Sequence, residues 1–181
     1  YTQVEQINKT YLRSHGLDRN GQLYKINFFE YQRYEDVIRL STDPEYDLEA
    51  FEELLEVKGD DDHSKLIAML DAVNDYSIPI EETVETYFDA ENLCYWMAFH
   101  ILAGNTDTQS RNYYLYSPLN SRKFYVISWD NDGAFKRDEY RLSNRSQGGA
   151  WERGLSNYWG NVLYQRMFKA EVYRERLDDA I

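Results

Sequence analysis

Residues 99–116 read Phe-His-Ile-Leu-Ala-Gly-Asn-Thr-Asp-Thr-Gln-Ser-Arg-Asn-Tyr-Tyr-Leu-Tyr, and residues 123–135 read Lys-Phe-Tyr-Val-Ile-Ser-Trp-Asp-Asn-Asp-Gly-Ala-Phe. The first stretch predicts an apolar helix that ends at Gly104 and is followed by a short polar loop, because Gly commonly follows the last helical residue. The aromatic and β-branched runs 113–116 and 124–129 predict the two strands of a hairpin. We therefore expect the chain to be organised around a helix, a loop and a hairpin.

Four acidic or amide side chains lie at the ends of these elements. Asp107 and Asn112 share the loop, and the hairpin returns Asp130 and Asp132 beside it. This set suits phosphoryl transfer, in which a loop Asp orients the attacking hydroxyl while an Asn and a second Asp hold Mg²⁺. Taken singly, each group has a structural interpretation, since Asp and Asn also stabilise turns through their own backbone. Together they would repel one another unless a cation lay among them, which favours a functional site.

Composition excludes some classes of partner. The chain has 181 residues and 43% hydrophobic content, enough for a core, with 20 basic and 32 acidic residues and a net charge of −12. So acidic a surface would repel nucleic acid. Cys94 is the only cysteine, which excludes an internal disulfide. No apolar run approaches the roughly 20 residues of a membrane-spanning helix. The chain starts at Tyr1 rather than Met, which suggests an excised segment.

Other helices and strands are predicted from apolar periodicity and from turn and cap residues. Residues 31–46 are expected to be strand or loop, and residues 136–155, with Gly148-Gly149, an extended loop. Ser156 is expected to cap the penultimate helix. The predicted elements are helices over 5–14, 47–58, 65–74, 79–86, 90–103, 157–168 and 171–181, and a strand over 22–29. The helix over 90–103 is apolar nearly all round, which indicates a central, buried helix.

The three histidines are not expected to bind metal. His100 lacks a second His, Cys or acid at helical ligand spacing, so the sequence favours a core or capping role. His15 and His63 are expected at the surface. The run Asp60-Asp-Asp62 is interpreted as acids favoured by the dipole at a helix N-terminus rather than as a cation site.

Several blocks in this order resemble the CotH family, the spore-coat atypical protein kinases. The resemblance runs almost end to end through the chain, and it rests on the ordered set rather than on any single block. These blocks are Val4-Glu-Gln-Ile7 with Tyr11-Leu12, Gly21-Gln-Leu-Tyr-Lys25, Gly104-Asn-Thr-Asp107 with Asn112-Tyr-Tyr-Leu-Tyr116, Trp129-Asp-Asn-Asp132, and Asn161-Val-Leu-Tyr-Gln-Arg166 with Tyr173-Arg-Glu-Arg176.

The resemblance implies an α+β, divergent protein-kinase-like fold, with a mostly helical C-terminal lobe and an active-site β-hairpin. It implies a partial kinase-like domain in which residues 1–46 are a remnant of the smaller nucleotide lobe with a linker. Residues 47–181 would be the helical lobe with the catalytic loop and the metal-binding segment. The implied activity is transfer of phosphate from ATP to Ser or Thr of coat or surface proteins, with Mg²⁺ or Mn²⁺. Spore-coat, cell-surface and secreted locations all fit the family.

Carried over residue by residue, Asp107 is similar to the catalytic-loop Asp that orients or deprotonates the substrate hydroxyl. Asn112 is similar to the metal-holding Asn, Asp130 resembles the metal-binding Asp after the hairpin, and Asp132 is expected to assist it. Glu5 is expected near the adenine, as part of a hinge.

One family feature does not match. Family members carry, upstream of the Glu5 block, strands with a Gly-rich cover and a Lys that contacts the ATP phosphates. Lys9 and Lys25 are the only early lysines here, and neither lies in that motif. Because such a Lys offsets phosphate charge, we expect this segment alone to bind nucleotide poorly and to turn over slowly or not at all.

Two other classes of function stay open at this point. The first is a non-catalytic adhesion or scaffold module on the same fold, as for some CotH-like surface ligands. The second is a metal-dependent phosphoesterase. Such enzymes usually have a bridging-metal arrangement with His ligands, which His100 alone does not supply. Retention of the Asp107, Asn112 and Asp130 set favours the kinase over the scaffold.

Overall fold

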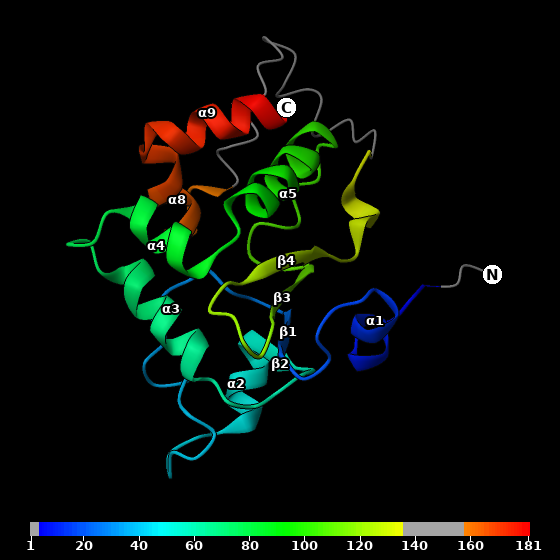
Figure 1. The fold of residues 1–181 in the computed structure, drawn as a ribbon, viewed down its shortest axis with the longest axis vertical. Coiled ribbons are helices and arrows are strands. Elements are labelled where there is room, and N and C mark those ends of the chain that lie inside the picture. Colours follow the sequence, from blue (N-terminus) through cyan, green and yellow to red (C-terminus); the bar gives the residue numbers. More distant parts are fainter. Residues whose placement is uncertain (1–3, 136–157) are drawn as a thin grey trace.

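A computed structural model describes residues 4–135 and 158–181. The predicted α+β class is confirmed, with helices arranged around one antiparallel sheet (Figure 1). The helices are α1 (Lys9–Ser14), α2 (Leu48–Leu54), α3 (Ser64–Asn74), α4 (Ile80–Tyr87), α5 (Ala90–Leu102), the 3-10 helix η1 (Asn131–Gly133), α8 (Val162–Lys169) and α9 (Glu171–Ala180); the strands are β1 (Gln22–Ile26), β2 (Leu55–Val57), β3 (Tyr113–Ser117) and β4 (Tyr125–Ser128).

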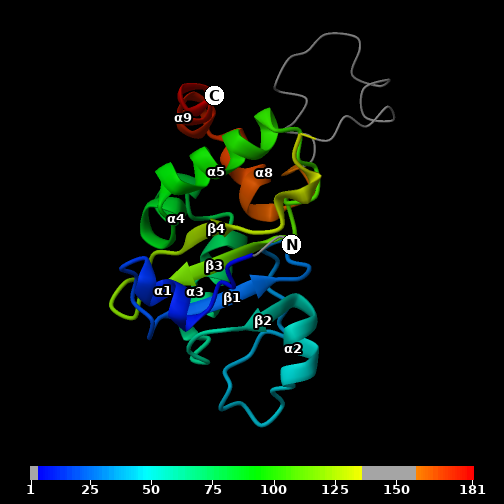
Figure 2. The same ribbon diagram turned by 90° about the vertical axis from the view of Figure 1, so that its right-hand side faces the viewer.

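The sheet has the strand order β2-β1-β3-β4, and every neighbouring pair is antiparallel. The predicted hairpin is present as β3 and β4, with Leu115 opposite Val126. β1 pairs with β3 across a long sequence separation, with Tyr24 opposite Leu115. Figures 1 and 2 show β2 and α2 at one end of the molecule and α5 and α9 at the other.

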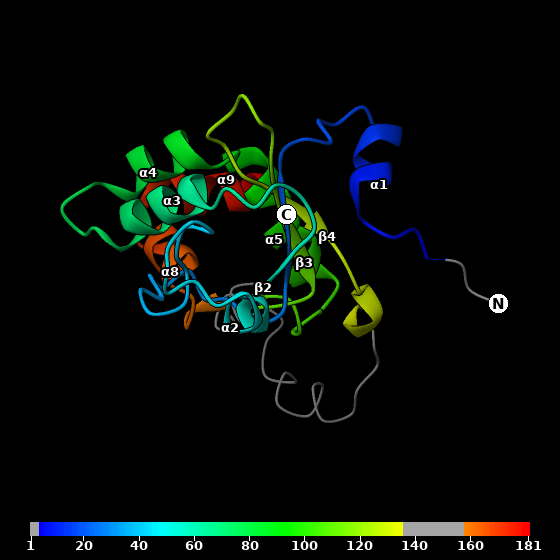
Figure 3. The same ribbon diagram turned by 90° about the horizontal axis from the view of Figure 1, so that it is seen from below.

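The two faces of the sheet are covered differently. Successive residues of a strand point to opposite faces, and here Tyr24 enters the main core among the helices while Leu23 enters a second, smaller core. The smaller core contains Ile7 and Leu12 from the segment around α1. Figure 3 shows α1 on one side of the strands and α3, α4 and α8 on the other. An open cleft lies on the face toward α1.

Polar side chains cap the N-termini of most of the helices that the sequence predicted. Asn8, Asp47, Asp89 and Asn161 each accept a hydrogen bond from a backbone N–H of the first turn. α1 and α8 begin later than predicted because Asn8 and Asn161 are the residues that cap them. The expectations for Ser156 and for the loop over 136–155 lie outside the described residues.

The helix predicted over 47–58 is wrong beyond Leu54. Leu55 has an extended backbone, and residues 55–57 form β2, with Glu56 opposite Lys25 of β1. The side chain of Leu55 is still fully buried, so this apolar residue reaches the core as the sequence predicted, but from a strand instead of a helix. Pairing with β1, which is distant in sequence, overrides the local helical periodicity.

His63 is buried, which corrects its expected surface position. Its Nδ1 lies 2.9 Å from the hydroxyl of Tyr24, its Nε2 lies 3.1 Å from the hydroxyl of Tyr46, and its ring stacks on Phe51. Burial lowers the pKa of His63, although the neighbouring acids of 60–62 oppose that effect. Two tyrosine partners from distant segments explain how a polar ring is satisfied in the core.

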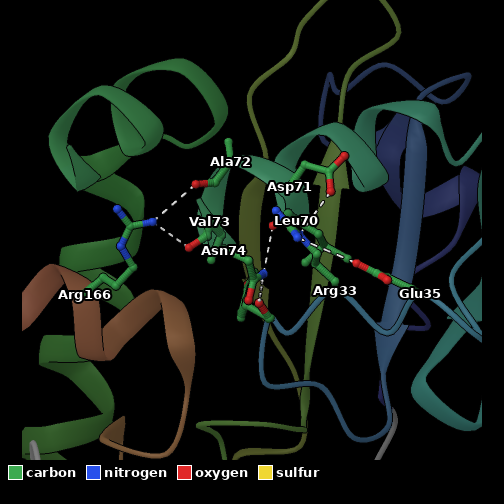
Figure 4. A network of polar contacts seen from close by, with 9 residues as sticks. Arg33, Glu35, Leu70, Asp71, Ala72, Val73, Asn74 and Arg166 are labelled. Atoms are coloured by element: carbon green, nitrogen blue, oxygen red, sulfur yellow. Dashed lines mark hydrogen bonds and ion pairs between the residues drawn. The ribbon is translucent and has the colours of Figure 1, made fainter. Parts of the chain in front are cut away.

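Arg166 connects the C-terminal helices to the end of α3 (Figure 4). The guanidinium is buried and donates to the carbonyl oxygens of Val73, Ala72, Asp75 and Ile78, at 2.6, 3.3, 3.2 and 2.5 Å. The last carbonyls of a helix lack intrahelical partners, and a cation there is favoured by the helix dipole. Arg166 thus fixes α8 against the helical layer that supports the sheet.

Candidate active site

The loop after α5 is held by a buried amide. Asn105 is 3% exposed, and its backbone N–H donates to the carbonyl of His100 at 2.9 Å. Its side-chain Oδ1 accepts the backbone N–H of Asp107 at 3.2 Å, and its Nδ2 lies 3.3 Å from His100 Nδ1. Gly104 has a positive φ of 62°, which reverses the chain directly after the helix. The position of Asp107 is therefore set from the end of a buried helix.

Asp107 and Asn112 are in direct contact. Asn112 Nδ2 donates to the backbone carbonyl of Asp107 at 2.9 Å and to its Oδ2 at 3.2 Å, so the amide closes the loop. Arg111 Nε lies 3.3 Å from Oδ1 of the same carboxylate. About half of the Asp107 side chain is exposed, at 49%. The carboxylate is thus oriented by two neighbours while it still faces solvent.

The end of the hairpin returns to this loop. The backbone N–H of Trp129 donates to the carbonyl of Asn112 at 3.3 Å, directly before Asp130. Further on, the N–H of Phe135 donates to the carbonyl of Ala103 at 2.8 Å, which ties the segment after η1 to the end of α5. The predicted loop and the predicted acidic segment therefore lie against each other.

Gly133 packs against the loop that contains Asn105 and Asp107. A Cβ on Gly133 would lie 2.6 Å from Asn105 Oδ1 and 3.7 Å from Asp107 Cβ, and the first of these distances is too short for any real side chain. A larger residue at position 133 would force the Asn105 side chain to shift, so glycine lets the turn that contains Asp130 and Asp132 pack against the loop without disturbing Asn105. Asp130 and Asp132 themselves are exposed.

Asn112 and Asp130 both have left-handed backbones, with φ of 61° and 50°. Asn and Asp tolerate this region better than other non-glycine residues, although it is still unfavourable. Such conformations persist where the surrounding structure enforces them, and they gather at functional sites. Here Asn112 is the acceptor of the hydrogen bond from Trp129, and Asp130 directly follows the donor.

A cleft of about 1030 Å³ opens on the face of the sheet toward α1. It is lined by Glu5 and other residues before α1, by Lys25, Glu56 and Lys58 of the β1–β2 edge, and by Trp129, Asp130 and Asn131 at the end of the hairpin. The structure thus brings Glu5 to the same cleft as Asp130. Asp107, Asn112 and Asp132 are not among its lining residues, so the predicted residues form two adjoining groups, joined through Trp129 and Gly133.

Within 4–135 and 158–181, no three His, Cys, Asp or Glu side chains converge as a metal-binding group. The residues nevertheless fit a hard divalent cation, because Asn112, Asp130 and Asp132 offer only oxygen ligands. Mg²⁺ is usually held by one or two carboxylates together with substrate phosphates, and it does not need a complete protein cage.

Two other reactive groups are buried. Burial lowers the pKa of His100 to about 4, so its ring is neutral, and it lies in the core as the sequence favoured. Burial raises the pKa of the Cys94 thiol to about 11, so it is not a nucleophile.

Sequence reasoning missed Asn105, Gly133, Glu56 and Lys58. Asn105 and Gly133 are adjacent to predicted site residues in sequence, but nothing in the pattern says that they touch. Glu56 and Lys58 were assigned to a helix, whereas Glu56 lies in β2 opposite Lys25 and the N–H of Lys58, directly after β2, donates to the carbonyl of Leu23 at 2.8 Å. The polar residues between the helix end and Asp107 were the one available signal for Asn105, and they include Thr106 as well.

We expect Gly133→Ala to lower any phosphoryl transfer about 10- to 100-fold, because the new methyl group displaces Asn105 Oδ1 from the N–H of Asp107. The unfolding free energy should fall by only about 1–2 kcal/mol, since one hydrogen bond is lost. The check is the initial rate of transfer beside a urea titration. Gly160→Ala is the matched control, because its Cβ would meet only Glu30 Oε1, at 4.0 Å. Equal rates for both variants would contradict the role given to Gly133.

Comparison with known proteins gives one family. The family described as CotH kinase protein matches residues 1–181, which is the whole chain. None of the curated proteins matches this chain.

Proposed function

The chain belongs to the CotH family, and we propose that it is an ATP-dependent protein kinase acting on Ser or Thr of coat or surface proteins. The observation that carries this proposal is the contact between Asp107 and Asn112, with the Asp130 segment bonded to the same loop through Trp129. A carboxylate, an amide and a second carboxylate on a loop and a hairpin end are what phosphoryl transfer uses.

In this proposal Asp107 orients the substrate hydroxyl and accepts its proton. Its carboxylate is half exposed, so a hydroxyl can reach it, while Arg111 and Asn112 restrict its rotation. A fixed carboxylate lowers the entropy cost of aligning the attacking oxygen. Most of the catalysis is then positioning, with little covalent work for the protein.

Asn112, Asp130 and Asp132 are the proposed ligands for Mg²⁺ or Mn²⁺. The metal would neutralise charge on the ATP phosphates. Glu5, which lines the cleft with Asp130, is proposed to lie near the adenine. We also propose that the chain has a divergent kinase-like fold. In it, residues 1–46 are a remnant of the nucleotide lobe with a linker, and residues 47–181 are the helical lobe. Among the described residues, no helix has the length and apolar character needed to cross a bilayer.

The proposal is tested with the natural full-length protein, incubated with radiolabelled ATP and either Mg²⁺ or Mn²⁺. We expect metal-dependent incorporation of label into Ser or Thr of the protein itself or of a coat protein, and its loss when the metal is chelated. Hydrolysis of a phosphate ester without nucleotide would instead favour the phosphoesterase. A folded protein that binds no nucleotide with either metal would overturn the kinase, and an adhesion or scaffold module would replace it.

A further inference from the structure

Two lysines and one glutamate form a compact charged cluster in the cleft. Lys25 Nζ lies 3.4 Å from Glu56 Oε2, and Lys58 Nζ contacts Glu56 Oε1. All three side chains are about one-third exposed, at 34% for each lysine and 30% for the glutamate. The pKa of Glu56 is lowered, chiefly by its hydrogen bond from Lys58, with a smaller contribution from Lys25.

The sheet fixes this cluster on one face. Lys25 of β1 is directly opposite Glu56 of β2. Lys58 follows Glu56 by two positions, so its side chain lies on the same face of the sheet as that of Glu56. Tyr114 of β3 is opposite Lys25 and also lines the cleft. The cluster is therefore supported by paired strands rather than by a free loop.

The charges of the cluster do not balance. Two ammonium groups share one carboxylate, which leaves a net positive charge within a chain of net charge −12. Lysines on so acidic a protein have many carboxylates available, yet these two converge on one and face the cleft. An anion with several oxygens satisfies the remaining N–H donors, because each ammonium has three.

Asp130 lies elsewhere along the same cleft. From the strand order, the Lys25 strand and the strand that ends near Asp130 are separated by two strand spacings, roughly 10 Å. The cleft thus has a cationic region on the β1–β2 edge and an acidic region at the hairpin end, which suits a phosphate chain that reaches from a bound metal toward two lysines.

We propose that Lys25 and Lys58 form a phosphate subsite of the ligand bound in this cleft, with Glu56 holding the two ammonium groups in position. The inference deepens the proposed function and rests on it in one respect, namely that the phosphate is part of ATP.

The test is isothermal titration of the natural full-length protein with ATP, pyrophosphate and adenosine at fixed Mg²⁺. Removing the lysines alone would leave Glu56 to repel phosphate, so the variant is Lys25→Met/Glu56→Gln/Lys58→Met, compared with Glu56→Gln. Lys123→Met/Glu85→Gln is the matched control, because this pair is 3.9 Å apart and outside the cleft. Lys25→Arg/Lys58→Arg keeps both positive charges, so it shows whether phosphate binding needs only the charges or the lysine side chains themselves.

We expect the triple variant to bind ATP and pyrophosphate about 10- to 100-fold more weakly than Glu56→Gln, with adenosine unchanged, because charged hydrogen bonds to phosphate are lost. The double Arg variant should retain most of the affinity. The subsite is overturned if ATP and pyrophosphate weaken no more than in the Lys123 control, if adenosine weakens equally, or if the unmutated protein binds neither phosphate ligand. Lysine-dependent binding of pyrophosphate without binding of ATP would keep the subsite and remove the kinase proposal.

Discussion

Asp107→Asn is expected to lower kcat for phosphoryl transfer by about 10³-fold or more, because the proposed base that accepts the hydroxyl proton is removed. The substitution is nearly isosteric. The amide of Asn112 still reaches the backbone carbonyl at position 107, a contact of 2.9 Å that does not involve the carboxylate. The loop should therefore keep its shape, and the dissociation constant of ATP should change by less than about threefold.

The measurement separates turnover from binding, by single-turnover transfer beside calorimetric titration with ATP and Mg²⁺. Asp130→Asn should show the opposite pattern, with nucleotide affinity lost together with its metal dependence, since Asp130 is a proposed metal ligand. Asp36→Asn, an exposed Asp on another part of the surface, should leave both quantities unchanged. If Asp107→Asn transfers phosphate as fast as Asp36→Asn, Asp107 has only a structural role in the loop.

Arg166→Met is expected to lower the free energy of unfolding by about 3 kcal/mol or more, since four carbonyl groups lose a charged donor at a buried position. Four backbone carbonyls around the end of α3 accept from this guanidinium, which also stacks over Tyr76 with 4.8 Å to the ring centroid. Met fills a similar volume, so the effect reports the lost polar contacts rather than a large cavity.

Urea unfolding followed by far-UV circular dichroism measures this effect. Arg174→Met is the matched control, because Arg174 is exposed and donates to a single carbonyl, that of Phe168 at 2.8 Å. That control should lose about 1 kcal/mol or less. Arg166→Lys should fall between the two variants, because one ammonium cannot reach carbonyls on several sides. Equal urea midpoints for Arg166→Met and Arg174→Met would contradict the structural role of Arg166.

Local pattern was sufficient where an element depends mainly on its own residues. The helix that became α5 was predicted within one residue, because Asp89 caps it and Gly104 follows it. One face of that helix, with Tyr95 and Leu102, is exposed in the described part of the chain, so its burial was overestimated. The hairpin was also predicted, since two aromatic runs separated by a short polar turn have few alternatives.

Pattern failed where the partner is distant. Residues 55–57 continue a helical stripe in sequence, but they pair with residues 24–26 of β1. His63 was expected at the surface because it is polar, but Tyr24 and Tyr46, from two other segments, form hydrogen bonds with both of its ring nitrogens in the core. In each case the deciding contact spans a separation that no periodicity encodes.

The amino-acid pattern alone was enough to predict the family of the chain, the helix that is α5, the hairpin and the loop that holds Asp107 and Asn112, because each depends on residue types at short spacing. Three contacts became visible only in the folded chain: Gly133 packs on Asn105, Glu5 shares a cleft with Asp130, and Lys25 and Lys58 converge on Glu56. The physical reason is that the order of strands in a sheet and the approach of one loop to another are set by the packing of the whole chain.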